Sequence, residues 1–258
     1  MQREKINAVM KEHFIEMDTR LDQMVYEDYS HESIHNFRES IRRFRALLYL
    51  IKPLLSHNDY QLLERCSKHN FDRTSLIREI DVFEHGYGYY MRRATLEKLS
   101  LVVAPLIERI RNEGAFSEFN KFSDYKINLK NMTDIVMSRF MITQYNTLKD
   151  AFLQPVEIDN EEKAIHSKRM YVKKIKYIHD ITHPNDKGFE AVNECLEKFQ
   201  EIAKKLHDVC VNLRFIGQYQ LEDPVLLERL IKEHGIYQKA SENQYTLVRE
   251  SMKKAPHF

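Results

Sequence analysis

Two stretches of the sequence place a histidine ahead of basic residues at matching intervals. In residues 34–45, IHNFRESIRRFR, His35 is followed by arginines at offsets +3, +7, +8 and +10. In residues 165–176, IHSKRMYVKKIK, His166 is followed by one arginine and three lysines at the same offsets. Guanidinium groups bind phosphate oxygens through paired hydrogen bonds, and ammonium groups add mobile point charges. These residue types therefore indicate the binding of a polyanion.

The spacing places each set of cations on one side of a helix. At about 100° per residue, offsets 0, 3, 7, 8 and 10 span an arc of roughly 160°. We expect the basic arcs to face away from the core, because the opposite arc is apolar in both stretches. The apolar arc contains Phe37, Ile41, Phe44, Leu48 and Ile51 in the first stretch and Val172, Ile175 and Ile178 in the second.

Few acidic residues balance these charges. Glu39 is the one acid among the arginines of the first stretch, and no acid lies between Lys163 and Lys176 in the second. A solvated helix face usually mixes glutamate with lysine in i,i+4 pairs. Two basic stretches with so few acids are therefore better explained by a bound anion than by solvation. For either stretch alone, a solvated face is the alternative.

Matching segments also lie downstream of each stretch. Residues 78–82 read Arg-Glu-Ile-Asp-Val and residues 206–209 read Leu-His-Asp-Val, so both end in Asp-Val. An internal duplication explains the paired matches better than coincidence does. If a pseudo-twofold axis relates the two repeats, their basic faces are expected to converge on a shared groove or pore.

The elements that must carry these residues are helices. Six glycines and six prolines in 258 residues leave few breaks, and apolar residues recur at intervals of three and four. The sequence predicts an all-α fold of two four-helix bundles in one compact domain, with repeats at 1–115 and 116–258. The expected helices cover residues 3–28, 31–53, 57–92 with an optional break near Asn70, 95–112, 131–153, 160–182, 187–217 and 223–250.

Overall composition disfavours several function classes. Lysine and arginine total 40 against 39 aspartates and glutamates, so the net charge of +1 disfavours a non-specific nucleic-acid binder. The sequence begins without an apolar signal segment, and its apolar runs fall short of the roughly 20 residues of a membrane span. We therefore expect a cytoplasmic protein that does not bind membranes. Its three cysteines, Cys66, Cys195 and Cys210, are predicted to be reduced thiols.

At the two basic stretches the sequence resembles the CHAD family, the conserved histidine α-helical domain. The family motif is His-x2-Arg followed by a cluster of basic residues, and it is matched by His35, Arg38, Arg42, Arg43 and Arg45 and by His166, Arg169, Lys173, Lys174, Lys176 and Tyr177. Lys176 stands where the family usually has arginine, and Lys204-Lys205 stand where Leu-Gly is common. The resemblance covers nearly the whole chain and implies a central basic pore between two four-helix bundles.

The function that the resemblance implies is that of a stand-alone, non-enzymatic binder of inorganic polyphosphate. The motif residues and Arg78 are then the polyphosphate ligands, and no catalytic residue, metal or cofactor is implied. His35 and His166 are expected to donate hydrogen bonds to phosphate or to pack between helices, because nearby cations disfavour protonation of a histidine.

Residues of the downstream segments are expected to support the basic side chains. Asp81, His207 and Asp208 are predicted to lie behind them, where the carboxylates would orient arginines through paired hydrogen bonds. Simple packing salt bridges are an equal alternative for the two aspartates.

Two other functions stay open. His179-Asp180 and His207-Asp208 are dipeptides of the kind that metal-dependent phosphohydrolases use, although each is also explained as ordinary helix sequence. RNA also offers a phosphate chain, but the basic helices lack an aromatic stacking set, and residues 87–90, Tyr-Gly-Tyr-Tyr, are expected to close a helix contact. The sequence leaves open whether the chain acts at polyphosphate granules, regulates an enzyme or stores phosphate.

Overall fold

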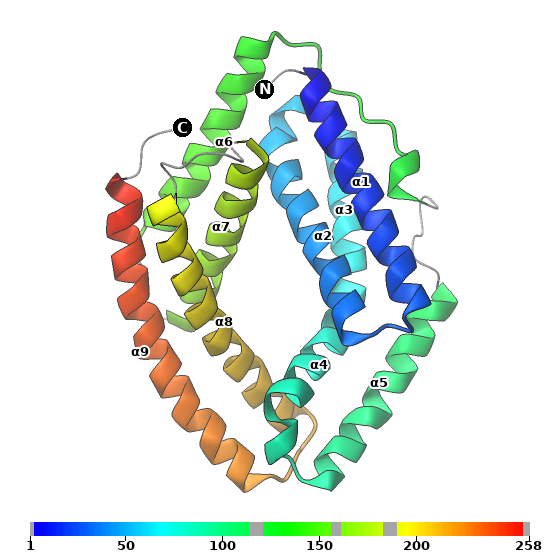
Figure 1. The fold of residues 1–258 in the computed structure, drawn as a ribbon, viewed down its shortest axis with the longest axis vertical. Helices are drawn as coiled ribbons and strands as arrows, with labels where there is room; N and C mark the ends of the chain where they lie inside the picture. The colour runs from blue at the N-terminus through cyan, green and yellow to red at the C-terminus, as the bar shows by residue number, and fades with distance from the viewer. Residues whose placement is uncertain (1–2, 114–120, 156–160, 183–189, 255–258) are drawn as a thin grey trace. The chain divides into compact units, whose positions relative to one another are not determined.

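The computed structural model describes residues 3–113, 121–155, 161–182 and 190–254. Within these ranges the chain forms nine α-helices, three short 3-10 helices and no strand apart from an isolated antiparallel bridge between Leu55 and Leu129 (Figure 1). The predicted all-α fold is confirmed. The helices are α1 (Arg3–Tyr26), α2 (His31–Ile51), α3 (His57–Arg73), α4 (Ser75–Tyr87), α5 (Arg93–Glu113), α6 (Asp134–Leu153), α7 (Glu161–Thr182), α8 (Glu190–Gln218) and α9 (Pro224–Lys254).

The starts of α2 and α3 follow from turn chemistry in the sequence. Ser30 and Ser56 immediately precede these helices, and both lie in the gaps between the predicted helices at 3–28, 31–53 and 57–92. Their side-chain oxygens accept hydrogen bonds from the backbone N–H groups of Ser33 and Asp59, respectively. Each serine thus satisfies one of the N–H groups that have no partner inside the helix.

The third predicted helix is two helices, α3 and α4, which meet at Thr74 rather than near Asn70. Asn70 is buried, and its side-chain amide donates to the carbonyl of Cys66, a contact one turn back that α3 accommodates. The carbonyl of Phe71 accepts a hydrogen bond from the guanidinium of Arg38 at 2.6 Å. Together with the hydroxyls of Thr74 and Ser75, this donor from another helix gives the Phe71 carbonyl the partners that it lacks at the end of α3.

The chain packs into two compact units. Unit 1 comprises residues 1–81 and 100–145, and its core forms where α1 packs along α2. The rings of Phe14 and Phe44 lie 5.3 Å apart between their centroids, and the buried Phe122 stacks on Phe14. The prediction that the apolar arc of the first basic stretch faces the core is confirmed. All of its residues are buried: Phe37, Ile41, Phe44, Leu48 and Ile51.

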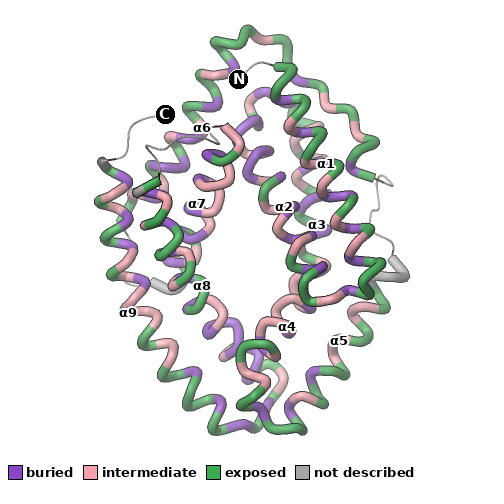
Figure 2. Tube along the Cα trace, in the orientation of Figure 1, coloured by how far each residue is buried: buried purple, intermediate pink, exposed green. Residues whose placement is uncertain are grey.

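Unit 2 comprises residues 82–99 and 146–258. Its longest contact runs between α8 and α9, which lie side by side and antiparallel, and α7 packs on α8 (Figure 1). The predicted apolar arc of the second basic stretch, Val172, Ile175 and Ile178, is fully buried. Along both α2 and α7, buried positions alternate with more exposed ones, as an amphipathic helix requires (Figure 2).

The limits of the two compact units fall within α4, α5 and α6. The repeats at 1–115 and 116–258 are divisions of the sequence, and they stay a prediction. Cys66, Cys195 and Cys210 are free thiols, as expected. In the part of the chain that the structure describes, no helix combines the length and the apolar character that crossing a membrane requires.

Candidate functional site

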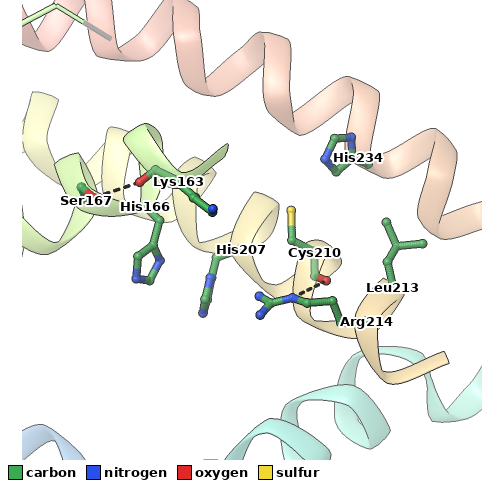
Figure 3. Close-up of a pocket in the computed structure, with 8 residues that line it drawn as sticks. All are labelled: Lys163, His166, Ser167, His207, Cys210, Leu213, Arg214 and His234. Carbon is green, nitrogen blue, oxygen red and sulfur yellow. Dashed lines mark hydrogen bonds between the residues drawn. The ribbon is translucent and has the colours of Figure 1, made fainter. Parts of the chain in front are cut away.

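A cavity of about 750 Å³ lies within unit 2, between side chains of α7, α8 and α9 (Figure 3). Residues three, four and seven apart share a face of an α-helix, and the lining follows this spacing on both α7 and α8. We call this cavity the histidine pocket. Its lining consists of Lys163, His166 and Ser167 of α7, His207, Cys210, Leu213 and Arg214 of α8, and His234 of α9.

The two motif-related histidines meet in this pocket. The rings of His166 and His207 lie 4.6 Å apart between their centroids and are tilted by 33°. The guanidinium of Arg214 lies beside His207, and its Nε donates to the carbonyl of Cys210 at 3.4 Å (Figure 3). Two imidazoles and a guanidinium from two helices therefore face one space.

The electrostatic field at His207 is positive. Burial is the main cause that lowers the pKa of His207, and with the smaller effects of Arg169, His166, Arg214 and Lys173 the pKa falls to about 3. The ring is therefore neutral at pH 7, and the positive field of its basic neighbours attracts an anion.

The other predicted residues of the second stretch have several environments. Arg169 is 7% exposed, which corrects the expectation that it faces away from the core. Lys176 donates to Glu197 of α8 at 2.7 Å, and this hydrogen bond lowers the pKa of the Glu197 carboxyl. The remaining predicted residues of this half, Lys173, Lys174, Tyr177 and Asp208, are half-buried.

Lys168, which was not among the predicted ligands, closes the end of α6. Its side chain is buried, and its ammonium donates to the carbonyls of Ala151 and Gln154 at 2.8 and 2.6 Å. The hydroxyl of Tyr245 also donates to the carbonyl of Gln154, and Arg249 donates to another carbonyl of the same turn. Burial lowers the pKa of Lys168 to about 8. This lysine therefore serves the fold, because the last carbonyls of a helix have no partner within it.

Arg38 is the clearest correction to the sequence prediction. It was expected to face away from the core as a phosphate ligand, yet its side chain is 5% exposed. Its Nη1 lies within hydrogen-bond distance of the Phe71 carbonyl and, at 3.0 Å each, of the hydroxyls of Thr74 and Ser75. The guanidinium also stacks 3.8 Å above the ring of Phe71. Arg38 therefore caps the C-terminal end of α3.

A long side chain at the edge of the basic arc can reach a neighbouring helix, which explains the burial of Arg38. Burial is the main cause that lowers its pKa, to about 9, and nearby Arg42 contributes. That pKa still leaves Arg38 charged at neutral pH. A charged donor suits the partial negative charge at a helix C-terminus.

The remaining cations of α2 point in different directions. Arg42 is half-buried and lies 3.3 Å from Glu39 of its own helix. Arg43 lies 3.9 Å from Glu16, so it is turned toward α1. His35 is exposed and Arg45 is half-buried.

A second small cluster in unit 1 joins α2 to α4. Nη1 of Arg78 lies 2.9 Å from Nδ1 of His31, and the same ring nitrogen lies 3.7 Å from Oδ2 of Asp81. Arg78 and Asp81 were predicted site residues, and the structure brings them together around His31. His31 was missed, although it lies one helical turn before His35 and so shares its face.

Other pocket residues were missed for a similar reason. Lys163 lies three residues before His166, and Arg214 lies seven residues after His207, so extending each helical face by one or two turns would have found both. His234 carries no such signal, because it belongs to another helix and no motif surrounds it.

Two further expectations concern metals and aromatic residues. Among the described residues, no three His, Cys, Asp or Glu side chains lie close enough to hold a metal ion together. The hydroxyl of Tyr87 donates to Glu233 at 2.6 Å, and Arg229 stacks on Tyr90, so these tyrosines do close a helix contact, as predicted. Tyr89, in contrast, is 94% exposed.

The sequence and the fold match those of known proteins. Residues 8–120 match the family model for the CHAD domain, and no curated protein matches the chain. PptA from Streptomyces chartreusis shares 14% sequence identity, with a TM-score of 0.60 over 98% of each chain. The CHAD domain from the plant Ricinus communis shares 16% identity, with a TM-score of 0.66 over 98% of this chain and 92% of that one. At such identities the two structures show a common fold over nearly the whole chain, and residues 8–120 are similar in sequence to the CHAD domain family.

Proposed function

We propose that the chain binds inorganic polyphosphate without catalysing a reaction on it, and that the histidine pocket is a principal contact. The observation that carries this proposal is the electrostatic character of the pocket. Every charged group that shifts the pKa of His207 is basic, and Arg214 and Lys163 line the same cavity. Crowded cations repel one another, and a polyanion removes that repulsion when it binds.

The length of the basic surface favours a phosphate chain over a single phosphate. Exposed Lys163 and half-buried Lys173 and Lys174 extend along α7 over about 16 Å at 1.5 Å per residue. One orthophosphate contacts only a small part of that length. A linked chain can contact all of it and pays the entropy cost of association once.

Unit 1 offers a second set of basic side chains for the same ligand. Exposed His35 and half-buried Arg42 follow His31 along α2 at helical spacing, and Arg78 of α4 contacts His31. Arg38 is excluded from this set because it caps α3. We propose that these side chains add contacts to polyphosphate. Substitutions in the two units belong in separate variants.

The test is a titration of fluorescently labelled polyphosphate at fixed salt. A variant with Lys173→Ala and Arg214→Ala should bind at least about tenfold more weakly, because each lost charge-assisted contact is worth roughly 1 kcal/mol or more. A matched control, Lys232→Ala with Lys239→Ala, removes the same charge from exposed positions of α9 that do not line the pocket. Equal weakening in both variants would reduce the effect to net charge and would refute a specific site.

Competition experiments separate the ligand classes. Unlabelled polyphosphate should displace the probe at a lower phosphorus concentration than orthophosphate does, and single-stranded RNA should compete poorly. Stronger competition by RNA would favour the RNA-binding alternative. Orthophosphate that competes as well as the polymer would refute chain binding.

The non-enzymatic part of the proposal has its own test. Polyphosphate incubated with the protein and Mg²⁺ or Mn²⁺ should keep its chain length on a gel. Metal-dependent shortening that is lost in His207→Gln would instead support the phosphohydrolase alternative.

A further inference from the structure

We propose that polyphosphate binding in the histidine pocket is coupled to the uptake of a proton by the His166–His207 pair, so that the chain binds its ligand more tightly as the pH falls. This inference rests on the proposed function and adds a form of regulation to the same site.

The geometry provides two imidazoles in one cavity. Their ring centroids are 4.6 Å apart, and both rings line the space that the ligand would occupy (Figure 3). Two positive charges at that distance repel strongly in a partly buried site. The empty pocket therefore disfavours a protonated pair, and one added proton is the change that an anion can most easily stabilise.

The charges that act on the pair come from α7 and α8, and titratable groups from all three helices surround it. These groups are Lys163, Arg169 and Lys173 of α7, Cys210 and Arg214 of α8, and His234 of α9. Burial is the main cause that lowers the pKa of His207, to about 3, and the charged groups that also lower it are all basic. The ring is thus neutral at any pH at which polyphosphate binding would normally be measured.

A bound phosphate chain reverses the balance at His207. Its negative charges offset the neighbouring cations, and a protonated imidazole gains a charge-assisted hydrogen bond to a phosphate oxygen. The pKa of the pair is therefore higher in the complex than in the free protein. In the pH range between these two values, the complex holds a proton that the free protein lacks.

Linkage fixes the sign and the size of the effect. When binding takes up one proton, the dissociation constant rises about tenfold for each unit of pH increase within that range. When neutral imidazoles bind the ligand as they are, the dissociation constant has no such slope.

The experiment is calorimetric titration of long-chain polyphosphate at about pH 5.5, in two buffers whose ionisation enthalpies differ. Interior phosphates of a long chain stay ionised there, so a dependence of the measured heat on the buffer reports protons taken up by the protein. The wild-type chain should take up about one proton per pocket. Uptake should be lost in His207→Gln and reduced in His166→Gln, and the pH slope of the affinity should flatten with it. His69→Gln changes an exposed histidine of unit 1 and should retain both the uptake and the slope.

Three results would overturn the inference. Wild-type binding without buffer dependence would show that the histidines stay neutral in the complex, and it would leave polyphosphate binding itself intact. Uptake that survives in the double variant His166→Gln/His207→Gln would place the proton elsewhere. No binding in any buffer would refute the proposed function, and the inference with it. Histidine ring signals in NMR spectra, recorded with and without polyphosphate, provide an independent readout of the protonation state.

Discussion

Replacing Arg38 with alanine tests whether this motif residue serves the fold or the ligand. In the structure its Nη1 faces three acceptors, at 2.6, 3.0 and 3.0 Å, but one nitrogen of a guanidinium carries only two hydrogens. Two good charge-assisted hydrogen bonds are therefore the realistic count. We expect Arg38→Ala to destabilise the protein and to do so through α3, whose C-terminal carbonyl loses this donor.

The magnitude follows from these contacts. Hydrogen bonds of charged groups contribute roughly 1.5 kcal/mol or more each, and the stacking on Phe71 adds about 1 kcal/mol. The hydroxyls of Thr74 and Ser75 also bond to the Phe71 carbonyl, so that group is not left without a donor. Removing a buried charge recovers part of its desolvation cost. The net loss should be about 3 kcal/mol in the free energy of unfolding.

The assay is urea unfolding followed by circular dichroism, with polyphosphate binding measured on the folded variants. Arg42→Ala is the matched control, since Arg42 lies one helical turn further on and makes a partly exposed ion pair with Glu39. Such pairs contribute about 1 kcal/mol or less, so this variant should unfold nearly as the wild type does. Unchanged stability in Arg38→Ala, accompanied by lost polyphosphate binding, would refute the capping role and restore Arg38 as a ligand.

Two further predictions concern the end of α6 and the ionic strength. Lys168→Met should cost about 2 kcal/mol at neutral pH, because the carbonyl of Ala151 in the last turn of α6 and that of Gln154 just after it lose their ammonium donor. Burial lowers the pKa of Lys168 to about 8, below the ordinary 10.5, so the unfolded chain binds more protons than the folded chain between these pH values. The stability of the wild type relative to this variant should therefore rise with pH in that range. Unfolding measurements that show the opposite slope there would contradict this prediction. Polyphosphate affinity should fall with salt at a slope on the order of −0.7 per contacted phosphate, and a titration whose affinity ignores salt would remove the electrostatic basis of the proposal.

The helices could be predicted because their signals are local. The apolar residues of α2 and α7 recur at intervals of three and four, and every residue assigned to their apolar arcs is buried. The predicted starts of α2 and α3 follow Ser30 and Ser56, whose side chains cap these helices in the structure. The break between α3 and α4 falls at Thr74, where the Phe71 carbonyl accepts hydrogen bonds from the local hydroxyls of Thr74 and Ser75 and from Arg38, 33 positions earlier in the sequence. No local pattern contains the contact with Arg38.

The site was predicted only in part, for a geometric reason. The helical arc tells which side of α7 a residue occupies, and it correctly separated His166 from the apolar residues beside it. It does not tell which side chains of α8 and α9 complete a cavity. His234 therefore emerged only from the structure, and His207 changed from a supporting residue to one that lines the pocket.

The duplicated motif combines two tasks at different offsets. Three residues after each histidine, Arg38 and Arg169 are both buried, and the first of them caps a helix. Seven residues after each histidine, Arg42 and Lys173 are only half-buried, and Lys173 contributes to the positive field at His207. A motif of this kind keeps its +3 position for the fold and leaves its +7 position accessible to an anion. Substitutions at +3 should therefore lower stability first, and substitutions at +7 should weaken binding in a protein that remains folded.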